Sequence, residues 1–179
     1  MALKPEQVVR DHAEDVAKQL RRIFGPSADI DDVFQAVFVE VIRSLDKFRG
    51  KSKLKTWIHR ITLNVAYQEM RMQYREREVR SHADLELIAC SDDVESGYVQ
   101  NESRKKLYRG LQTLDPKKRI AVILHDIEGY TLKEVGESVG RPLQTVASQV
   151  KSGRAELAAW FEQQEKARVP LSSTREVTL

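Results

Sequence analysis

Residues 29–45 have the sequence DIDDVFQAVFVEVIRSL, which is the strongest helix signal in the first half of the chain. Its first residues include carboxylates, which suit the amide-rich, positive end of a helix. Apolar side chains then recur at three- and four-residue steps, as on the buried face of an amphipathic helix. They are Ile30, Val33, Phe34, Val37, Phe38, Val41, Ile42 and Leu45. The stretch therefore predicts a helix that begins near Asp29 and packs this face against a core.

The opposite face of this helix carries Asp31, Asp32 and Gln35, with one apolar residue, Val39, among the polar ones. Single exposed hydrophobic residues are normal, so Val39 needs no function. The functional interpretation is a docking face for a protein partner, in which Asp32 and Gln35 make directional contacts around a small apolar centre. The residues alone leave both interpretations open.

A basic turn and a second helix follow directly. Residues 47–60 contain six Lys or Arg and no acid. Apolar positions then fall at helical spacing, at Leu54, Trp57 or Ile58, Ile61 and Val65, so one face packs inward while the cations face water. The cationic outer face, which extends to Arg71 and Arg80, is typical of a nucleic-acid groove. Cations near the C-terminal end of a helix also interact favourably with the helix dipole in any protein, which is the alternative interpretation. Trp57 likewise has an alternative interpretation, as a core residue.

The second half of the chain predicts a helix-turn-helix. Asp115-Pro116 is an N-cap followed by proline at the first helical position, and the core continues from Ile120 through Ile127. Thr131 and Glu134 form a capping box for a short helix that Gly140 closes. Arg141-Pro142 starts the last long helix.

This last helix divides into an apolar inner face and a polar outer face. The inner face is predicted to hold Leu143, Val146, Val150, Gly153, Leu157, Trp160 and Phe161, and the outer face Gln144, Thr145, Ser148, Gln149, Lys151 and Ser152. Such side chains suit groove reading, because Gln pairs with adenine edges, Ser and Thr with most bases, and Lys with phosphate. A plain solvated helix is the alternative, but it more often carries Glu and Lys pairs, and residues 142–155 contain no acid.

Composition favours helices throughout the chain. The 179 residues include 32% charged residues, 8 Gly and 5 Pro, with few segments of alternating β-branched residues. The net charge of +3 excludes a uniformly basic surface, so the distribution of charge along the chain is more informative about partners than its sum. Cys90 is the single cysteine, which excludes an internal disulfide. With no signal segment and no long apolar run, we expect a cytoplasmic protein without membrane insertion.

We therefore predict an all-α fold of two small helical domains joined by a flexible acidic linker. The expected boundaries are residues 1–80 for the first domain, 81–103 for the linker, 104–165 for the second domain and 166–179 for a disordered tail. The linker contains six acids and no Lys or Arg. Extended, it spans roughly 75 Å, although its charge has the simpler interpretation of keeping it solvated.

Linked motifs in both domains resemble the group 4 (extracytoplasmic function, ECF) bacterial sigma factors of the sigma-70 family. The motifs that resemble domain 2 of these factors are Asp31-Asp32-x-x-Gln35-x-x-Phe38, Phe48-Arg49-Gly50, Thr56-Trp57-x-x-Arg60-Ile61 and Asn64. The motifs that resemble domain 4 are Leu111-x-x-Leu114-Asp115, Arg119, Asp126-x-Glu128-Gly129-Tyr130-Thr131, Glu134-Val135-Gly136 and Thr145-Val146-x-Ser148-x-Val150-Lys151-x-Gly153-Arg154. The chain departs from the family pattern at Ala36, Gln68, Gln144, Ala147 and Gln149, so promoter preference does not transfer.

The resemblance implies an alternative sigma factor that binds core RNA polymerase and directs promoter recognition and melting, with no catalytic residue, metal or cofactor of its own. It implies contact with the β′ clamp coiled coil through Asp31, Asp32, Gln35 and Val39, and a further contact with the β flap. It implies minus-ten DNA binding by Phe48, Arg49, Lys51, Lys53, Lys55, Trp57, Arg60, Asn64 and Arg71. It implies minus-thirty-five DNA binding by Arg141, Gln144, Thr145, Ser148, Gln149, Lys151 and Arg154. Promoter DNA and an anti-sigma factor are the other implied partners.

Two other classes of protein compete with this interpretation. A stand-alone helix-turn-helix regulator explains residues 131–160 but leaves the motifs of residues 31–64 unused. A nucleic-acid enzyme is disfavoured, because His12, His59, His82 and His125 are scattered and no phosphate loop or nucleophile elbow occurs. Asp31 and Asp32 are a poor metal pair, since neighbours on a helix point about 100° apart.

Overall fold

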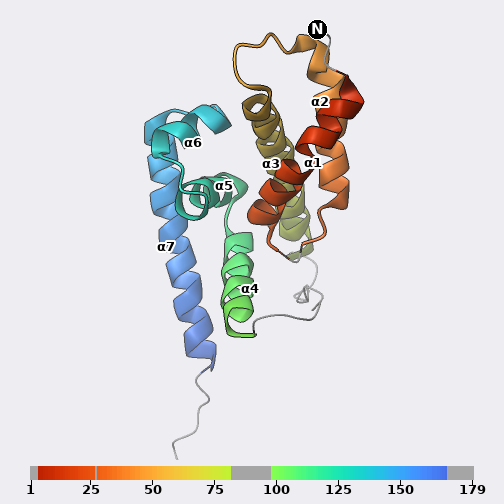
Figure 1. Ribbon diagram of the computed structural model, residues 1–179. Helices are drawn as coiled ribbons and strands as arrows, with labels where there is room; N and C mark the ends of the chain where they lie inside the picture. The colour runs from red at the N-terminus through yellow and green to blue at the C-terminus, as the bar shows by residue number, and fades with distance from the viewer. Residues whose placement is uncertain (1–3, 27, 82–97, 169–179) are drawn as a thin grey trace, which may run out of the picture.

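The structure is a computed structural model that describes residues 4–26, 28–81 and 98–168. Within these ranges every regular element is helical, which confirms the all-α prediction. The first bundle contains α1 (Pro5–Phe24), α2 (Asp31–Ser44), the 3-10 turn η1 (Leu45–Lys47) and α3 (Leu54–Ser81). The second contains α4 (Tyr98–Thr113), α5 (Pro116–Val122), the π-helical turn η2 (Ile123–Ile127), α6 (Leu132–Val139) and α7 (Leu143–Arg168). Figure 1 shows the two bundles side by side.

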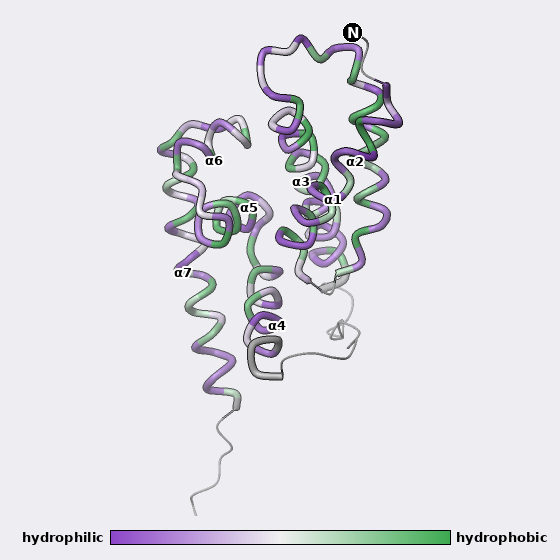
Figure 2. The backbone as a smooth tube through the Cα atoms, in the orientation of Figure 1, coloured by the Kyte–Doolittle hydropathy of each residue, from purple (hydrophilic) through white to green (hydrophobic). Residues whose placement is uncertain are grey.

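Apolar packing of α1, α2 and α3 holds the first bundle together. Hydrophobic positions recur along each helix among hydrophilic ones (Figure 2). The fully buried large side chains of this bundle are Val16, Leu20, Ile23, Val37, Val41, Leu63 and Met70. Each such side chain contributes roughly 1.5–3 kcal/mol relative to an exposed one. The buried residues of both bundles form one continuous cluster, so the two domains pack against each other.

Local signals at the helix ends of the second bundle behave as predicted. The carboxylate of Asp115 accepts a hydrogen bond from the backbone N–H of Lys117 at 2.8 Å, and Pro116 follows it at the first helical position. Thr131 and Glu134 form the complete capping box. Gly140 closes α6 in the left-handed conformation, with φ of 66°.

The turn between α6 and α7 is tight enough to require glycine at one further place. A Cβ on Gly136 would lie 2.7 Å from the carbonyl oxygen of Arg141, a backbone atom that cannot rotate away. The backbone N–H of Arg141 donates to the carbonyl of Gly136 at 2.9 Å across the same turn. Gly136 therefore sets how closely α7 approaches α6.

Three residues predicted to be buried are exposed. Ile42, Ile127 and Leu143 are 45%, 39% and 50% exposed, respectively. Ile42 lies at the edge of the buried face of α2, where its neighbour Val41 is fully buried. Ile127 is the last residue of η2, and Leu143 is the first residue of α7. Helical periodicity gave the direction of each side chain, whereas the extent of the packing partner decides its burial.

Two element boundaries also differ from the prediction. The helix expected from Arg104 begins at Tyr98, inside the stretch assigned to the linker, and α7 continues past residue 165 to Arg168. The rest of the linker, with His82 and Cys90, and the tail from residue 169 lie outside the described residues. No described helix is both long and apolar enough to cross a membrane.

Substituting Gly136 by Ala tests the tight turn. The added methyl group forces the backbone at Arg141 to move, so we expect a loss of about 1–3 kcal/mol in the free energy of unfolding. Chemical denaturation followed by circular dichroism measures it. Lys133→Ala, on the exposed face of the same helix, is the matched control and should change stability by less than about 0.5 kcal/mol. Equal stability of the Gly136 variant and the wild type would contradict the geometry of this turn.

Candidate nucleic-acid and polymerase interface

The outer face of α2 presents its predicted docking residues to solvent. Asp31, Asp32 and Gln35 are exposed, and Val39 is 54% exposed. The carboxylate of Asp29 accepts a hydrogen bond from the backbone N–H of Asp31 at 3.1 Å, which satisfies one free donor at the start of the helix. The face is therefore anionic at its first turn and apolar further along.

Ile42 is the residue of this face that sequence reasoning missed. It follows Val39 by three residues, so the two exposed side chains are neighbours on the helix surface. The spacing was visible in the sequence, but it was equally compatible with burial. Together Val39 and Ile42 make an apolar centre larger than one isolated hydrophobic residue.

An aromatic pair lies at the beginning of α3. The rings of Phe48 and Trp57 have centroids 5.2 Å apart at an interplanar angle of 47°. Both side chains are half-buried, and Trp57 packs against the core cluster. Trp57 is therefore both a core residue and a surface residue, because one part of the indole packs against the core and the rest remains accessible.

Three polar residues predicted to bind DNA share a face of α3 with Trp57. Arg60, Asn64 and Arg71 follow it at offsets of three, seven and fourteen residues, which helical geometry places on one side. All three are exposed. Arg49, Lys51 and Lys53 are exposed in the turn that precedes the helix, where Gly50 takes a φ of 69°. The aromatic pair is therefore continuous with a cationic surface.

Lys55 is separated from this group. It points to the other side of α3, where its Nζ lies 2.8 Å from a carboxylate oxygen of Asp15 on α1. The hydrogen bond from Lys55 holds the pKa of Asp15 below its ordinary value. Because both side chains are largely exposed, this ion pair contributes little to stability and can exchange partners.

The first half of α7 presents most of the predicted groove-reading side chains. Gln144, Thr145, Ser148 and Lys151 are exposed, and Gln149 is half-buried. Offsets of four and seven residues place Ser148 and Lys151 on the same side as Gln144. An α-helix that presents such side chains on one exposed face is a candidate for insertion in a major groove.

The two arginines that flank this face are engaged within the protein. The guanidinium of Arg141 lies 5.7 Å from the ring centroid of Tyr67 on α3. Arg154 forms a two-pronged ion pair with Asp126, with Nε 2.9 Å from the carboxylate. Arg154 therefore joins α7 to η2, which contains Asp126. Of the three cations assigned to this face, Lys151 is the one for which no ion pair or ring contact is described.

Comparisons with known families match both bundles. The model for sigma-70 region 2 matches residues 8–76, and the model for sigma-70 region 4 matches residues 104–157. The ECF RNA polymerase sigma factor SigE of Mycolicibacterium smegmatis is 32% identical over 153 residues, which are 85% of this chain and 59% of that protein. The ECF RNA polymerase sigma-E factor of Escherichia coli (strain K12) is 29% identical over 143 residues, 73% of each chain.

Solved structures share the fold. The sigma factor RpoE in complex with the anti-sigma factor NepR, from Bartonella quintana, matches with a TM-score of 0.58 and 19% identity over 88% of this chain and 96% of that chain. CnrH in complex with the cytosolic domain of CnrY matches with a TM-score of 0.53 and 24% identity over 89% of this chain and 88% of that chain. The chain belongs to the sigma-70 family, and its relatives place it in the ECF group. It spans about three fifths of the length of SigE.

Removing Lys55 tests whether its ion pair forms in solution. In Lys55→Met, the pKa of the Asp15 carboxylate should rise toward its ordinary value, because the hydrogen bond that lowers it is gone. Carbon-detected NMR titration of Asp15 measures the change. Lys53→Met is the control, since Lys53 makes no described contact with Asp15 and should leave the titration unchanged. The same Asp15 titration in Lys55→Met and wild type would mean that Lys55 is not bound to Asp15.

Proposed function

We propose that this protein is an alternative sigma factor, which binds core RNA polymerase and directs promoter recognition and melting. The observation that carries the proposal is the presence of both sigma-70 regions in one chain, each with an exposed face suited to its part. The protein supplies binding and specificity and performs no covalent chemistry. Among the described residues, no three His, Cys, Asp or Glu side chains are grouped as metal ligands would be.

The outer face of α2 binds the clamp coiled coil of the β′ subunit. Asp31, Asp32 and Gln35 supply the directional polar contacts, and Val39 with Ile42 supplies the apolar centre. Their exposure supports this assignment, since a stable interface needs an apolar core that is free to be covered. The second domain makes a separate contact with the β flap.

The aromatic pair of Phe48, which follows η1, and Trp57 of α3 receives a base of the minus-ten element. Unstacking a base costs a few kcal/mol, and stacking on an aromatic side chain returns about 1–3 kcal/mol per base. The accessible part of Trp57 offers such a surface beside Phe48, and Arg60 and Asn64 offer hydrogen bonds to base edges. The phosphates are bound by Arg49, Lys51, Lys53, Lys55 and Arg71, with Lys55 exchanging Asp15 for DNA.

The outer face of α7 reads the minus-thirty-five element in the major groove. Gln144, Thr145, Ser148 and Gln149 contact bases, while Lys151 contacts phosphate. Arg141 and Arg154 join the phosphate contacts once they leave Tyr67 and Asp126. An anti-sigma factor is a further partner, and the two structural neighbours support it, because each was solved with such a protein or a cytosolic partner domain.

Transcription from a genomic library tests the proposed function directly. Core RNA polymerase is supplied with and without this protein, and new start sites are mapped. New starts that share two upstream elements are the expected result, because the two domains read two separate DNA segments. No new starts, together with specific DNA binding in the absence of core polymerase, would favour a stand-alone helix-turn-helix regulator instead.

A variant with both Gln35→Ala and Val39→Ala tests the polymerase contact in the same assay. Both side chains are exposed, so the fold should be retained. The variant should lose the new starts because it no longer binds core polymerase. Glu14→Ala, which is exposed on α1, should keep them.

Single substitutions on α7 separate phosphate contacts from base contacts. Lys151→Ala should weaken binding to all promoters by a similar factor and reduce the salt slope of binding by about one, because one phosphate contact is lost. Gln144→Ala should cost about 1–3 kcal/mol at the preferred base and relax the sequence preference there. Competition binding of the polymerase holoenzyme at several salt concentrations distinguishes them. A changed base preference in the Lys151 variant would contradict its assignment to phosphate.

A further inference from the structure

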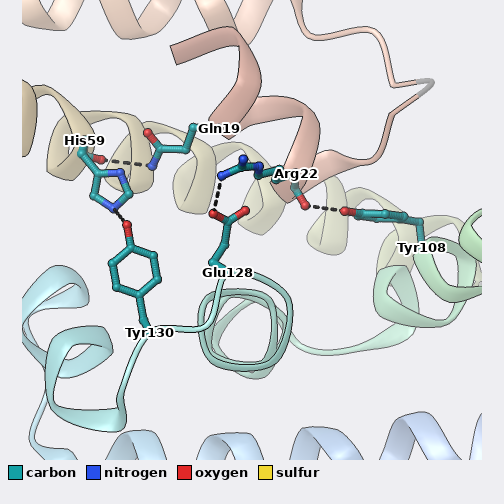
Figure 3. Close-up of polar contacts among 6 residues, drawn as sticks. All are labelled: Gln19, Arg22, His59, Tyr108, Glu128 and Tyr130. Atoms are coloured by element: carbon teal, nitrogen blue, oxygen red, sulfur yellow. Dashed lines mark hydrogen bonds and ion pairs between the residues drawn. The ribbon is translucent and has the colours of Figure 1, made fainter. Parts of the chain in front are cut away.

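Polar contacts join the two domains where the C-terminal half of α1 meets the end of η2 (Figure 3). The guanidinium of Arg22 lies 2.9 Å from a carboxylate oxygen of Glu128. The hydroxyl of Tyr108 on α4 donates a hydrogen bond to the backbone carbonyl of Arg22 at 2.6 Å. The Glu128 side chain is only 9% exposed, and its second oxygen has no hydrogen-bond partner in the structure.

A buried arginine crosses the same boundary. Arg119 of α5 is 4% exposed, and it donates a hydrogen bond to the backbone carbonyl of Ile23 at 3.3 Å. Its guanidinium lies 5.7 Å from the ring centroid of Phe24. The negative end of α1 and the aromatic face partly compensate the buried charge, although burial still lowers the pKa of Arg119 to about 10. The Nε of Arg119 has no partner.

These contacts place charged groups at the boundary between the domains. Burying charged groups is costly unless every donor and acceptor is paired. Arg119 and Glu128 each keep one unpaired atom in the packed state. A small change in charge at this boundary can therefore shift the balance between packed and separated domains.

His59 of α3 is the titratable group placed to cause such a change. The Tyr130 ring from the second domain stacks on its imidazole with centroids 5.7 Å apart, and the Tyr130 hydroxyl lies 3.5 Å from Nε2 (Figure 3). The side-chain amide of Gln19 donates to the carbonyl of His59 at 3.3 Å, which fixes the backbone beside it. The ring borders a cavity of about 180 Å³ between α1, α3 and the second domain.

The charges that face this cavity make a proton on His59 unfavourable. The charged groups come from α1 (Asp15, Lys18 and Arg22), from α3 (Lys55, with Arg60 next to His59) and from the second domain (Glu128). His12 and Tyr130 are the other titratable residues that line the cavity. The two carboxylates already bind cations, since Asp15 binds Lys55 and Glu128 binds Arg22. Burial, with repulsion from Arg60 and Lys55, lowers the pKa of His59 below its ordinary value.

We propose that the contact between His59 and Tyr130 is a proton-sensitive latch, in which the neutral imidazole favours packed domains and its protonation favours their separation. Separation removes the cover that the second domain gives His59, while Arg60 and Lys55 remain beside it on α3. The separated state therefore binds a proton at His59 more readily than the packed state does. The packed state is fully favoured above the ordinary histidine pKa of about 6.5 and loses that advantage as the pH falls below it. Each unit of pKa difference between the states changes their ratio tenfold.

Separation would release groups that the proposed sigma activity needs, and this consequence rests on that proposed function. Arg141, assigned to the minus-thirty-five contact, lies against Tyr67 of α3 in the packed state. Tyr67 belongs to the helix that carries the minus-ten surface, so packing ties the two DNA-binding domains together. A lower pH should free both to reach separate elements of a promoter.

Small-angle X-ray scattering of the full chain tests the latch without polymerase or DNA. At constant ionic strength, the radius of gyration should increase as the pH falls from 8 to 5.5. His59→Gln, which cannot gain a proton in this range, should lose most of that increase. His12→Gln is the matched control, because His12 borders the same cavity and the described contact with Tyr130 belongs to His59. This variant should retain the increase in the radius of gyration. No increase in the wild type, or an equal increase in His59→Gln, would overturn the proposal.

An NMR titration of His59 gives a second measurement that does not depend on the His59 variant. In Tyr130→Ala the imidazole loses its cover from the second domain, so its pKa should rise toward the ordinary value. The radius of gyration of this variant should be larger than that of the wild type at pH 8. An unchanged pKa of His59 would show that the second domain does not control its protonation and would refute the latch. Failure of the library transcription experiment alone would leave both of these results unaffected.

Discussion

The first domain is held together by the burial of one face of α3 against α1 and α2. Leu63 and Met70 are fully buried on that face, so the remaining faces of the helix have fixed directions. Arg60 consequently points toward solvent and Trp57 is half-buried beside the basic turn, whereas Lys55 points toward Asp15 of α1. A single long helix thereby supplies part of the core, the surface assigned to the minus-ten element and, at His59 and Tyr67, contacts with the other domain.

Features governed by neighbouring residues were predictable from the sequence. The capping box of Thr131 with Glu134 and the N-cap at Asp115 depend on atoms two or three residues apart, and both are present. The family motifs also gave the two domains, which the matched sigma-70 regions confirm. Periodicity was less informative at Ile42 and Leu143, because it gives the direction of a side chain and not how far the neighbouring helices extend.

Contacts between the domains were not predictable from the sequence. The ion pair of Arg22 with Glu128 joins residues 106 positions apart, and the hydrogen bond from Arg119 joins residues 96 positions apart. No periodic pattern links such residues, and a buried arginine runs against the usual preference for exposed cations. Arg119 was noticed only as part of a family motif, and the structure adds that it reaches the end of α1. The candidate site residues were recognised by motif, whereas the internal partners of Lys55, Arg141 and Arg154 required the structure.

The π-helical turn η2 has a geometric consequence for everything that follows it. Its wider turn takes up one more residue than an α-helical turn does, with the backbone N–H of Glu128 bonded to the carbonyl of Ile123, five residues earlier. One residue corresponds to about 100° of rotation around a helix. The extra residue thus changes the phase of the chain just before Glu128 and Tyr130, the two side chains that meet the first domain. Related chains with an ordinary α-helical turn here would aim those positions elsewhere, so domain packing of this kind can be gained or lost through a single inserted residue.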